Sequence, residues 1–174
     1  MKRRQALVAA CRAAGCATAL PWLALPAAAA PTPPGQVVAW PEVALLDGSR
    51  WGQAQAAGQA VVVVFWSTTC PFCRRHNQHV QKLVQAAAGL PLAVLGVARD
   101  RDAEAVRRYA AQQGYSFAIT LQHAPLAAVL TARSVIPLTA TVDRQGRLKH
   151  VIPGEMFEED VMELLKLARS PDRT

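Results

Sequence analysis

Charged residues and cysteines are both scarce in this chain of 174 residues. Charged residues make up 18% and hydrophobic residues 52%, which excludes a wholly disordered chain and allows a packed core. Cysteines number four, at Cys11, Cys16, Cys70 and Cys73, too few for a small domain held together by several disulfides. The length is that of one ordinary domain with an appendage.

Acidic residues are absent before Glu42, although four basic residues precede it. These four account for most of the formal net charge of +7, and the chain from Ala30 onward carries only +3. A net charge this small is typical of a solvated surface and not of a phosphate-binding stripe. We therefore expect no nucleic-acid partner.

The first 29 residues are arranged like a secretory signal peptide. A short basic head precedes an Ala- and Leu-rich stretch at 6–25 and small residues up to Ala29. We expect cleavage after Ala29, export to the periplasm and a Pro-rich linker at 30–36. Two alternatives are less favoured: an uncleaved membrane anchor, which Arg12 would interrupt, and a lipoprotein signal ending at Cys16.

After the linker, runs of strand-forming residues alternate with amphipathic helical stretches. We expect strands at 37–46, 60–66, 92–97, 116–121, 138–142 and 148–152, and helices at 71–88, 102–113, 125–132 and 157–169. Asp143-Arg144-Gln145-Gly146 predicts a hairpin, so the last two strands are antiparallel. The alternation predicts one α/β domain at 37–170, with a central mixed sheet flanked by helices.

Cys70-Pro71-Phe72-Cys73 follows the apolar run at 60–66 and begins the first long helix. A helix N-terminus has unpaired N–H groups and a positive dipole end, which favour a thiolate at Cys70. Cys73 lies nearly one turn further on, close enough to form a disulfide with Cys70 and covered by the helix. We expect the basic side chains that follow to lower the pKa of the Cys70 thiol further: Arg74, Arg75 and His76.

A purely structural disulfide is one alternative for this pair of cysteines. Closing so short a loop stabilises a protein by ~2 kcal/mol, against ~4.7 kcal/mol for a loop of roughly 100 residues, so a redox-active pair is favoured. A zinc site with His76 and His79 is disfavoured, because steps of three residues along a helix turn the ligands to opposite faces. Cu(I) bound by the two thiolates remains open.

Ile136-Pro137 begins the strand expected at 138–142. One interpretation is a strand entry, where proline is tolerated. The alternative is a cis proline that faces the cysteines, with a preceding backbone free to pair with an extended substrate peptide. Because the cysteines are present, we favour the cis proline.

The stretch Phe65-Trp66-Ser67-Thr68-Thr69-Cys70-Pro71-Phe72-Cys73, taken with Ile136-Pro137, resembles the thioredoxin superfamily over roughly 37–169. The additional strand and helix between residues 92 and 132 are similar to the insertion of the periplasmic TlpA/ResA group. The N-terminal strand pair expected around Asp47-Gly48 is also similar to that group. The resemblance implies a thioredoxin-like fold with these two additions.

The resemblance also implies a thiol-disulfide oxidoreductase whose redox-active, catalytic pair is Cys70 and Cys73, without a metal or other cofactor. Substrate contacts are expected from three neighbouring residues: Phe72, Ile136 and Pro137. The resemblance favours a monomeric reductase of disulfides in selected exported proteins, of the cytochrome c maturation or copper-site assembly type. A membrane electron donor of the DsbD/CcdA type would keep it reduced.

Two other functions stay open. One is a dithiol oxidase of the DsbA type. The other is a periplasmic Cu(I) metallochaperone, which would need a third ligand such as His123 or His150. The family pattern also differs near the site: Val64 stands where thioredoxin has a buried acid. Asp100 is a candidate proton shuttle, whereas Asp102 is more simply a helix N-cap.

N-terminal sequencing of the exported protein is expected to begin at Ala30, because the small residues at 27–29 suit cleavage by a signal peptidase. Expression with export, followed by Edman or mass-spectrometric sequencing, measures this directly. Recovery of Met1 in the exported protein would contradict cleavage and support an anchor.

Overall fold

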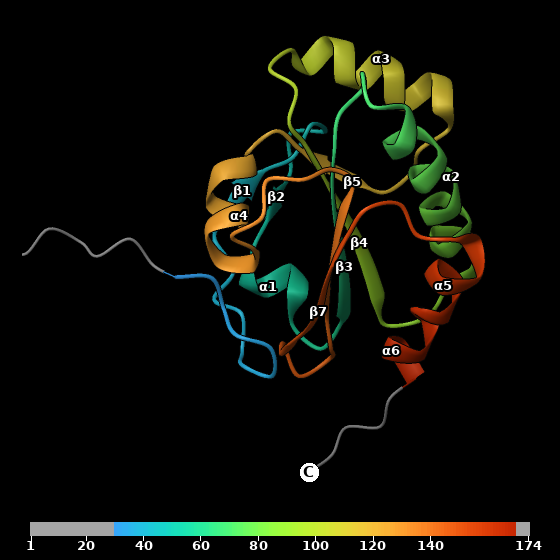
Figure 1. Ribbon diagram of the computed structural model, residues 1–174. Helices are drawn as coiled ribbons and strands as arrows, with labels where there is room; N and C mark the ends of the chain where they lie inside the picture. Colours follow the sequence, from blue (N-terminus) through green and yellow to red (C-terminus); the bar gives the residue numbers. More distant parts are fainter. Residues whose placement is uncertain (1–29, 170–174) are drawn as a thin grey trace, which may run out of the picture.

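The apolar run Ala60–Trp66 forms β3, the central strand of a five-stranded sheet of order β5-β4-β3-β6-β7 (Figure 1). All of β3 is buried, because helices cover both faces of the sheet. The other strands are β4 (Leu92–Ala98), β5 (Ala118–Thr120), β6 (Leu138–Val142) and β7 (Leu148–Pro153). β3 is parallel to β4 and antiparallel to β6, which confirms the expected mixed α/β sheet.

The computed structural model describes residues 30–169, so the expected signal peptide at 1–29 and residues 170–174, which include the last position of the expected domain, lie outside the described part. No helix within the described part is long and apolar enough to cross a bilayer. The stretch expected to be a linker lies against the domain. The N–H of Thr32 donates to the carbonyl of Val129 at 2.9 Å, and that of Gly35 donates to the carbonyl of Leu148 at 2.7 Å.

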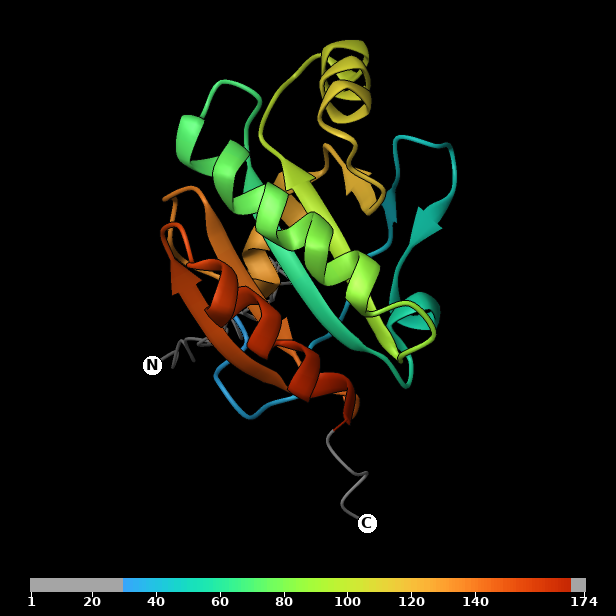
Figure 2. The same cartoon turned by 90° about the vertical axis from the view of Figure 1, so that its right-hand side faces the viewer.

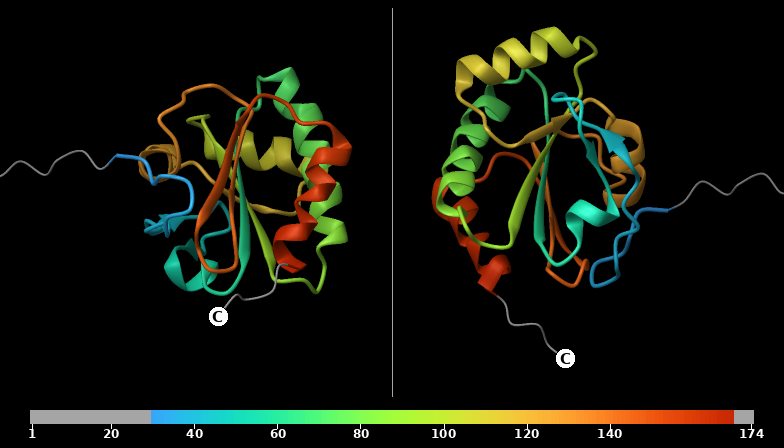
Figure 3. Two further views of the ribbon diagram at one scale, coloured as in Figure 1. Left: turned by 60° about the horizontal axis from the view of Figure 1, so that its bottom comes forward. Right: turned by 180° about the vertical axis from the view of Figure 1, so that it is seen from behind.

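Two apolar cores lie on opposite faces of the sheet, because successive side chains of β3 alternate between them. Val62, Val64 and Trp66 join the core under α2 (Pro71–Ala86), α3 (Ala103–Gln113), α5 (Glu158–Glu163) and α6 (Leu165–Arg169). Figure 2 shows α2 crossing this face with α5 and α6 beside it. The other face carries α1 (Gln53–Ala56), α4 (His123–Leu130) and the antiparallel pair β1 (Val43–Ala44) and β2 (Arg50–Trp51) (Figure 3).

Three of the differences from the sequence prediction have a local cause. The strand expected at 37–46 is reduced to β1, because Pro41 within it has no N–H for a strand ladder. The helix expected at 125–132 begins earlier, at His123, since Pro125 is tolerated in a first turn. The last helix is divided into α5 and α6 at Leu164, whose N–H bonds the carbonyl of Val161, only three residues back.

Gly96 in β4 leaves no room for a side chain: an added Cβ would lie 2.7 Å from Cε2 of Phe117 and 3.1 Å from Nε1 of Trp66. We expect Gly96→Ala to lower the free energy of unfolding by about 1–3 kcal/mol, because these rings are fixed by the core. Urea unfolding measures the change. Gly52→Ala is the control, because its added Cβ would lie nearest to Cγ of the exposed Glu42 side chain, at 3.1 Å, and at an ordinary contact distance of 3.6 Å from the Cα of Glu42. A Gly96→Ala variant as stable as the wild type would contradict the packing.

Candidate active site

The cysteine motif and the Ile136-Pro137 loop lie at the same end of the sheet. β3 ends at Trp66 and leads into the motif, while β6 begins at Leu138, which pairs with Phe65 near that end of β3. The peptide bond between Ile136 and Pro137 is cis, which confirms the expected isomer.

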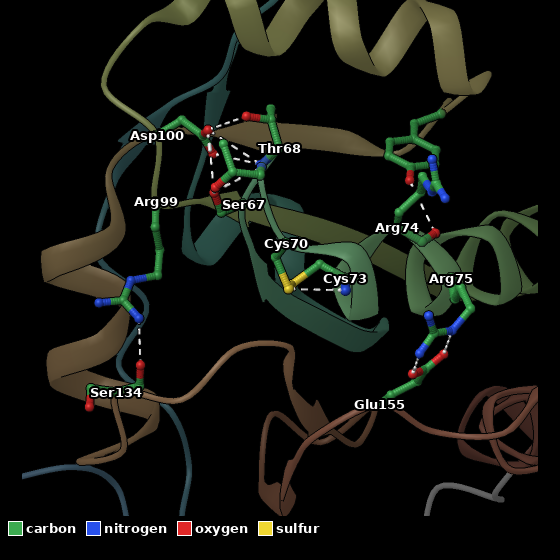
Figure 4. Close-up of a disulfide and its surroundings, with 12 residues drawn as sticks. Ser67, Thr68, Cys70, Cys73, Arg74, Arg75, Arg99, Asp100, Ser134 and Glu155 are labelled. Atoms are coloured by element: carbon green, nitrogen blue, oxygen red, sulfur yellow. Dashed lines mark hydrogen bonds and ion pairs between the residues drawn. A yellow bond between two sulfur atoms is a disulfide. The ribbon is translucent and has the colours of Figure 1, made fainter.

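Cys70 is the N-cap residue of α2 and forms a disulfide with Cys73 (Figure 4). The N–H of Cys73 points to Sγ of Cys70 at 3.1 Å, and Pro71 occupies the first turn, where its missing N–H costs no hydrogen bond. Cys70 is partly exposed, whereas Cys73 is completely buried. Solvent and a substrate can therefore reach Cys70, and the helix covers Cys73.

Asp100 holds the loop that leads into Cys70. Its carboxylate accepts hydrogen bonds from Oγ1 of Thr68 at 2.5 Å, from the N–H of Thr68 at 3.1 Å and from Oγ of Ser67 at 3.4 Å. These contacts make Asp100 a positioning residue for the loop. The carboxylate of Asp102 accepts from two N–H groups at the start of α3, which confirms the predicted N-cap.

The charge of Arg75 is compensated by a carboxylate. Its guanidinium donates two hydrogen bonds to Glu155, at 2.9 and 2.7 Å, and lies over the ring of Phe72 with 5.0 Å between its central carbon and the ring centroid. This pairing offsets much of the positive charge that Arg75 was expected to bring near the thiol. Phe72, which was expected to contact substrate, is 55% exposed.

His76 is completely buried between α2, β6 and the segment before α5. Its Nδ1 accepts from the N–H of Met156 at 3.2 Å, so Nε2 carries the proton and donates to Oγ1 of Thr139 at 3.0 Å. Burial lowers the pKa of His76 to about 4, with a smaller contribution from His79. His76 is therefore neutral at pH 7, and the expectation that it adds positive charge is wrong.

Sequence reasoning missed Thr139 and Glu155, the partners of His76 and Arg75. A signal for Thr139 was present, because a threonine in a short buried strand needs a hydrogen-bond partner. For Glu155 we find no such signal, since it is separated from Arg75 by 80 positions in the sequence. Only the packing of the segment before α5 against α2 brings the two together.

A Cu(I) site would have few ligands in this arrangement. Within residues 30–169, no three His, Cys, Asp or Glu side chains gather as a metal site would require. His123 packs edge to face against Phe65, and His150 lies exposed on β7. A copper ion here would therefore be limited to the two sulfurs of Cys70 and Cys73.

A mixed sheet, a disulfide at the start of α2 and a cis proline at the same end of the sheet define a class, the thiol-disulfide oxidoreductases of thioredoxin fold. The model of one family, described as Redoxin, matches residues 31–166, and the chain belongs to this family. The predicted resemblance to the thioredoxin superfamily is thereby confirmed.

Two relatives of this chain are described as thiol-disulfide oxidoreductases. The chain is 27% identical over 126 residues to the thiol-disulfide oxidoreductase ResA of Halalkalibacterium halodurans, covering 71% of this chain and 70% of that protein. It is 28% identical over 123 residues to the ResA protein of Geobacillus thermodenitrificans, covering 70% of each.

Solved structures show the same fold. A thioredoxin family thiol:disulfide interchange protein from Chlorobium tepidum superposes with a TM-score of 0.71 at 23% identity, over 81% of this chain and 100% of that one. A secreted thiol-disulfide isomerase from Corynebacterium glutamicum gives 0.69 at 22% identity, over 76% of this chain and 86% of that one.

The buried, neutral His76 predicts a loss of stability in acid. Its pKa is about 4 in the folded protein, against 6.5 for an unburied histidine, so the unfolded chain binds more protons between these values. The free energy of unfolding is therefore expected to fall as the pH drops from 6.5 to 4, with this group contributing at most about 3 kcal/mol. Urea unfolding across this pH range measures the slope.

The matched variants for this prediction are His76→Leu and His79→Leu. We expect His76→Leu to be less stable at pH 7 but to lose this part of the pH dependence, because no buried imidazole remains to be protonated. His79 lies on the same helix, is only half-buried and makes the smaller contribution to the lowered pKa of His76, so His79→Leu should keep most of the slope. A wild-type slope in His76→Leu would contradict the assignment.

Proposed function

We propose that this protein is an exported disulfide reductase in which Cys70 attacks the substrate and Cys73 resolves the intermediate. The observation that carries the proposal is the unequal exposure of the two sulfurs: Cys70 is partly exposed at the N-terminus of α2, and Cys73 is fully buried. A helix N-terminus favours the thiolate form of the sulfur that caps it, and the thiolate is the nucleophile in disulfide exchange.

The reaction is an exchange of two disulfides. The Cys70 thiolate attacks one sulfur of the substrate disulfide, the Cys70–substrate bond forms, and the first substrate sulfur leaves as a thiolate and takes up a proton. Cys73 then loses its proton and attacks Sγ of Cys70, which releases the second substrate sulfur as a thiol. The substrate gains two electrons and two protons, and the protein is left with the Cys70–Cys73 disulfide.

Apolar surface beside Cys70 supports binding of an extended substrate peptide. Phe72 is 55% exposed, and Val135, in the loop before the cis proline, is 45% exposed. Ile136 is partly buried and Pro137 buried at the start of β6. We assign Phe72, Ile136 and Pro137 to substrate contact, with the backbone before Pro137 pairing with the substrate chain.

The charges near Cys70 favour reduction over oxidation. A pair becomes more oxidising as its reduced form, with the Cys70 thiolate, is stabilised. His76 is neutral and Arg75 is paired with Glu155, so neither supplies free positive charge to the thiolate. Arg74 has no carboxylate partner in the described part of the chain, but its side chain is exposed, so water and salt screen its charge. Phe72, between the cysteines, supplies no charge. The helix N-terminus is left as the main stabilising group, which supports a reducing pair.

Export, substrates and the electron donor complete the proposal. The basic and apolar N-terminus supports export, and one structural neighbour is described as secreted. We propose a monomer in the periplasm that reduces disulfides of selected exported proteins, as in cytochrome c maturation or copper-site assembly. A membrane donor of the DsbD/CcdA type would return electrons to the Cys70–Cys73 disulfide by the same exchange.

Trapping the mixed disulfide tests the roles of the two cysteines. Cys73→Ser is expected to accumulate a covalent adduct with a disulfide-bonded substrate through Cys70, because nothing resolves it. Cys70→Ser is the matched control and should form no adduct, since Cys73 is buried. Non-reducing electrophoresis with mass spectrometry measures both. Adducts through Cys73 in the Cys70→Ser variant would reverse the assignment.

A further inference from the structure

Arginine side chains gather around the end of the sheet that carries Cys70. Within the described part of the chain, four of them have no carboxylate partner: Arg74, Arg99, Arg101 and Arg133. Arg99 donates to the carbonyl of Ser134 at 2.5 Å. This carbonyl is a neutral acceptor, so it leaves the charge of Arg99 uncompensated. Arg133 directly precedes Ser134 in the chain. In Figure 4, Arg99 and Arg74 flank the disulfide.

The carboxylates at this end of the sheet are already engaged. Asp100 accepts three hydrogen bonds from Ser67 and Thr68, and Asp102 caps α3. Glu155 pairs with Arg75. The donors to Asp100 and Asp102 are neutral groups, so these acids still balance part of the local positive charge. Within residues 30–169, however, none of the four arginines forms an ion pair with them, and all four side chains are exposed to solvent.

A cleft beside the cysteine loop collects part of this charge. It has a volume of about 610 Å³, and its walls include Arg99, Asp100, Arg101 and the start of α4 at Gln122 and His123. Asp100 also binds Thr68, two positions before Cys70, so this carboxylate connects the cleft to the cysteine loop. Because both arginines line the cleft, a chain that presents a disulfide to Cys70 can place neighbouring side chains beside them.

We propose that this arginine surface, Arg74, Arg99, Arg101 and Arg133, selects substrate disulfides that are flanked by acidic side chains. The inference rests on the proposed function, because it concerns what Cys70 attacks. Carboxylates on either side of the substrate cysteines would meet guanidinium groups on both sides of Cys70, and lysines there would be repelled. The charges are exposed, so the preference acts at low ionic strength and weakens as salt screens it.

Single-turnover reduction of model peptides tests the proposal without any upstream donor. The full-length protein is reduced and freed of reductant, then mixed with disulfide peptides that differ only in the flanking residues: Glu, Gln or Lys. One protein dithiol consumes one peptide disulfide and releases one peptide dithiol, and the rate constant is followed by peptide thiol release. We expect the Glu peptide to react roughly ten-fold faster than the Lys peptide at low salt, and the ratio to shrink as salt is added.

The test variant combines Arg101→Gln with Arg133→Gln. The control variant combines Lys149→Gln with Arg169→Gln, which removes the same number of positive charges far from Cys70. Lys149 adjoins Leu148, which pairs with the far end of β6, and Arg169 ends α6. Arg101 and Arg133 are exposed and their side chains make no ion pair within residues 30–169, so their removal leaves the fold intact. We expect the first pair to reduce the Glu-to-Lys ratio about three-fold or more, and the control to retain it.

The other outcomes distinguish failure of the arginine surface from failure of the proposed reductase. Equal rates for the three peptides, or a Glu preference that survives in Arg101→Gln with Arg133→Gln, would overturn the arginine surface while leaving the proposed reductase intact. Failure to reduce any peptide, including the Gln peptide, would instead overturn the proposed function.

Discussion

The contact from the N–H of Cys73 to Sγ of Cys70, at 3.1 Å, is the interaction on which the rest of the site depends. It exists because Cys70 caps α2 and Pro71 lets the helix begin at once. The same N–H, directed at a thiolate in the reduced protein, stabilises the reactive form. Asp100 secures the approach to this cap by holding the loop at Thr68.

The remaining polar groups around the pair hold the structure in place more than they supply charge. His76 joins α2 to β6 through Thr139 and stays neutral because it is buried. The Arg75–Glu155 pair connects the N-terminal part of α2 to the segment before α5. Four other arginines remain in solvent, where water and salt screen their effect on the sulfur. They can still act on a substrate that displaces this water, which separates substrate choice from the properties of the thiol.

The parts of the fold predicted well are those that local sequence determines. The apolar run at 60–66 is β3 to the residue, because a strand buried on both faces must be apolar throughout. The start of α2 could be predicted from Pro71. The cis bond before Pro137 could be predicted because the chain also contains the cysteine motif. The charges were predicted poorly. From the sequence, His76 was expected to carry a positive charge. Only its burial against Met156 and Thr139 shows that it is neutral.

The central claim is that the Cys70 thiolate is stabilised mainly by the helix N-terminus, without added charge from Arg75 or His76, and that the Cys70–Cys73 pair is therefore reducing. Equilibrating the protein with a glutathione redox buffer and quantifying the two forms measures this potential. We expect a value near that of thioredoxin, about −270 mV. A value near that of the strong oxidant DsbA, about −120 mV, would contradict the account.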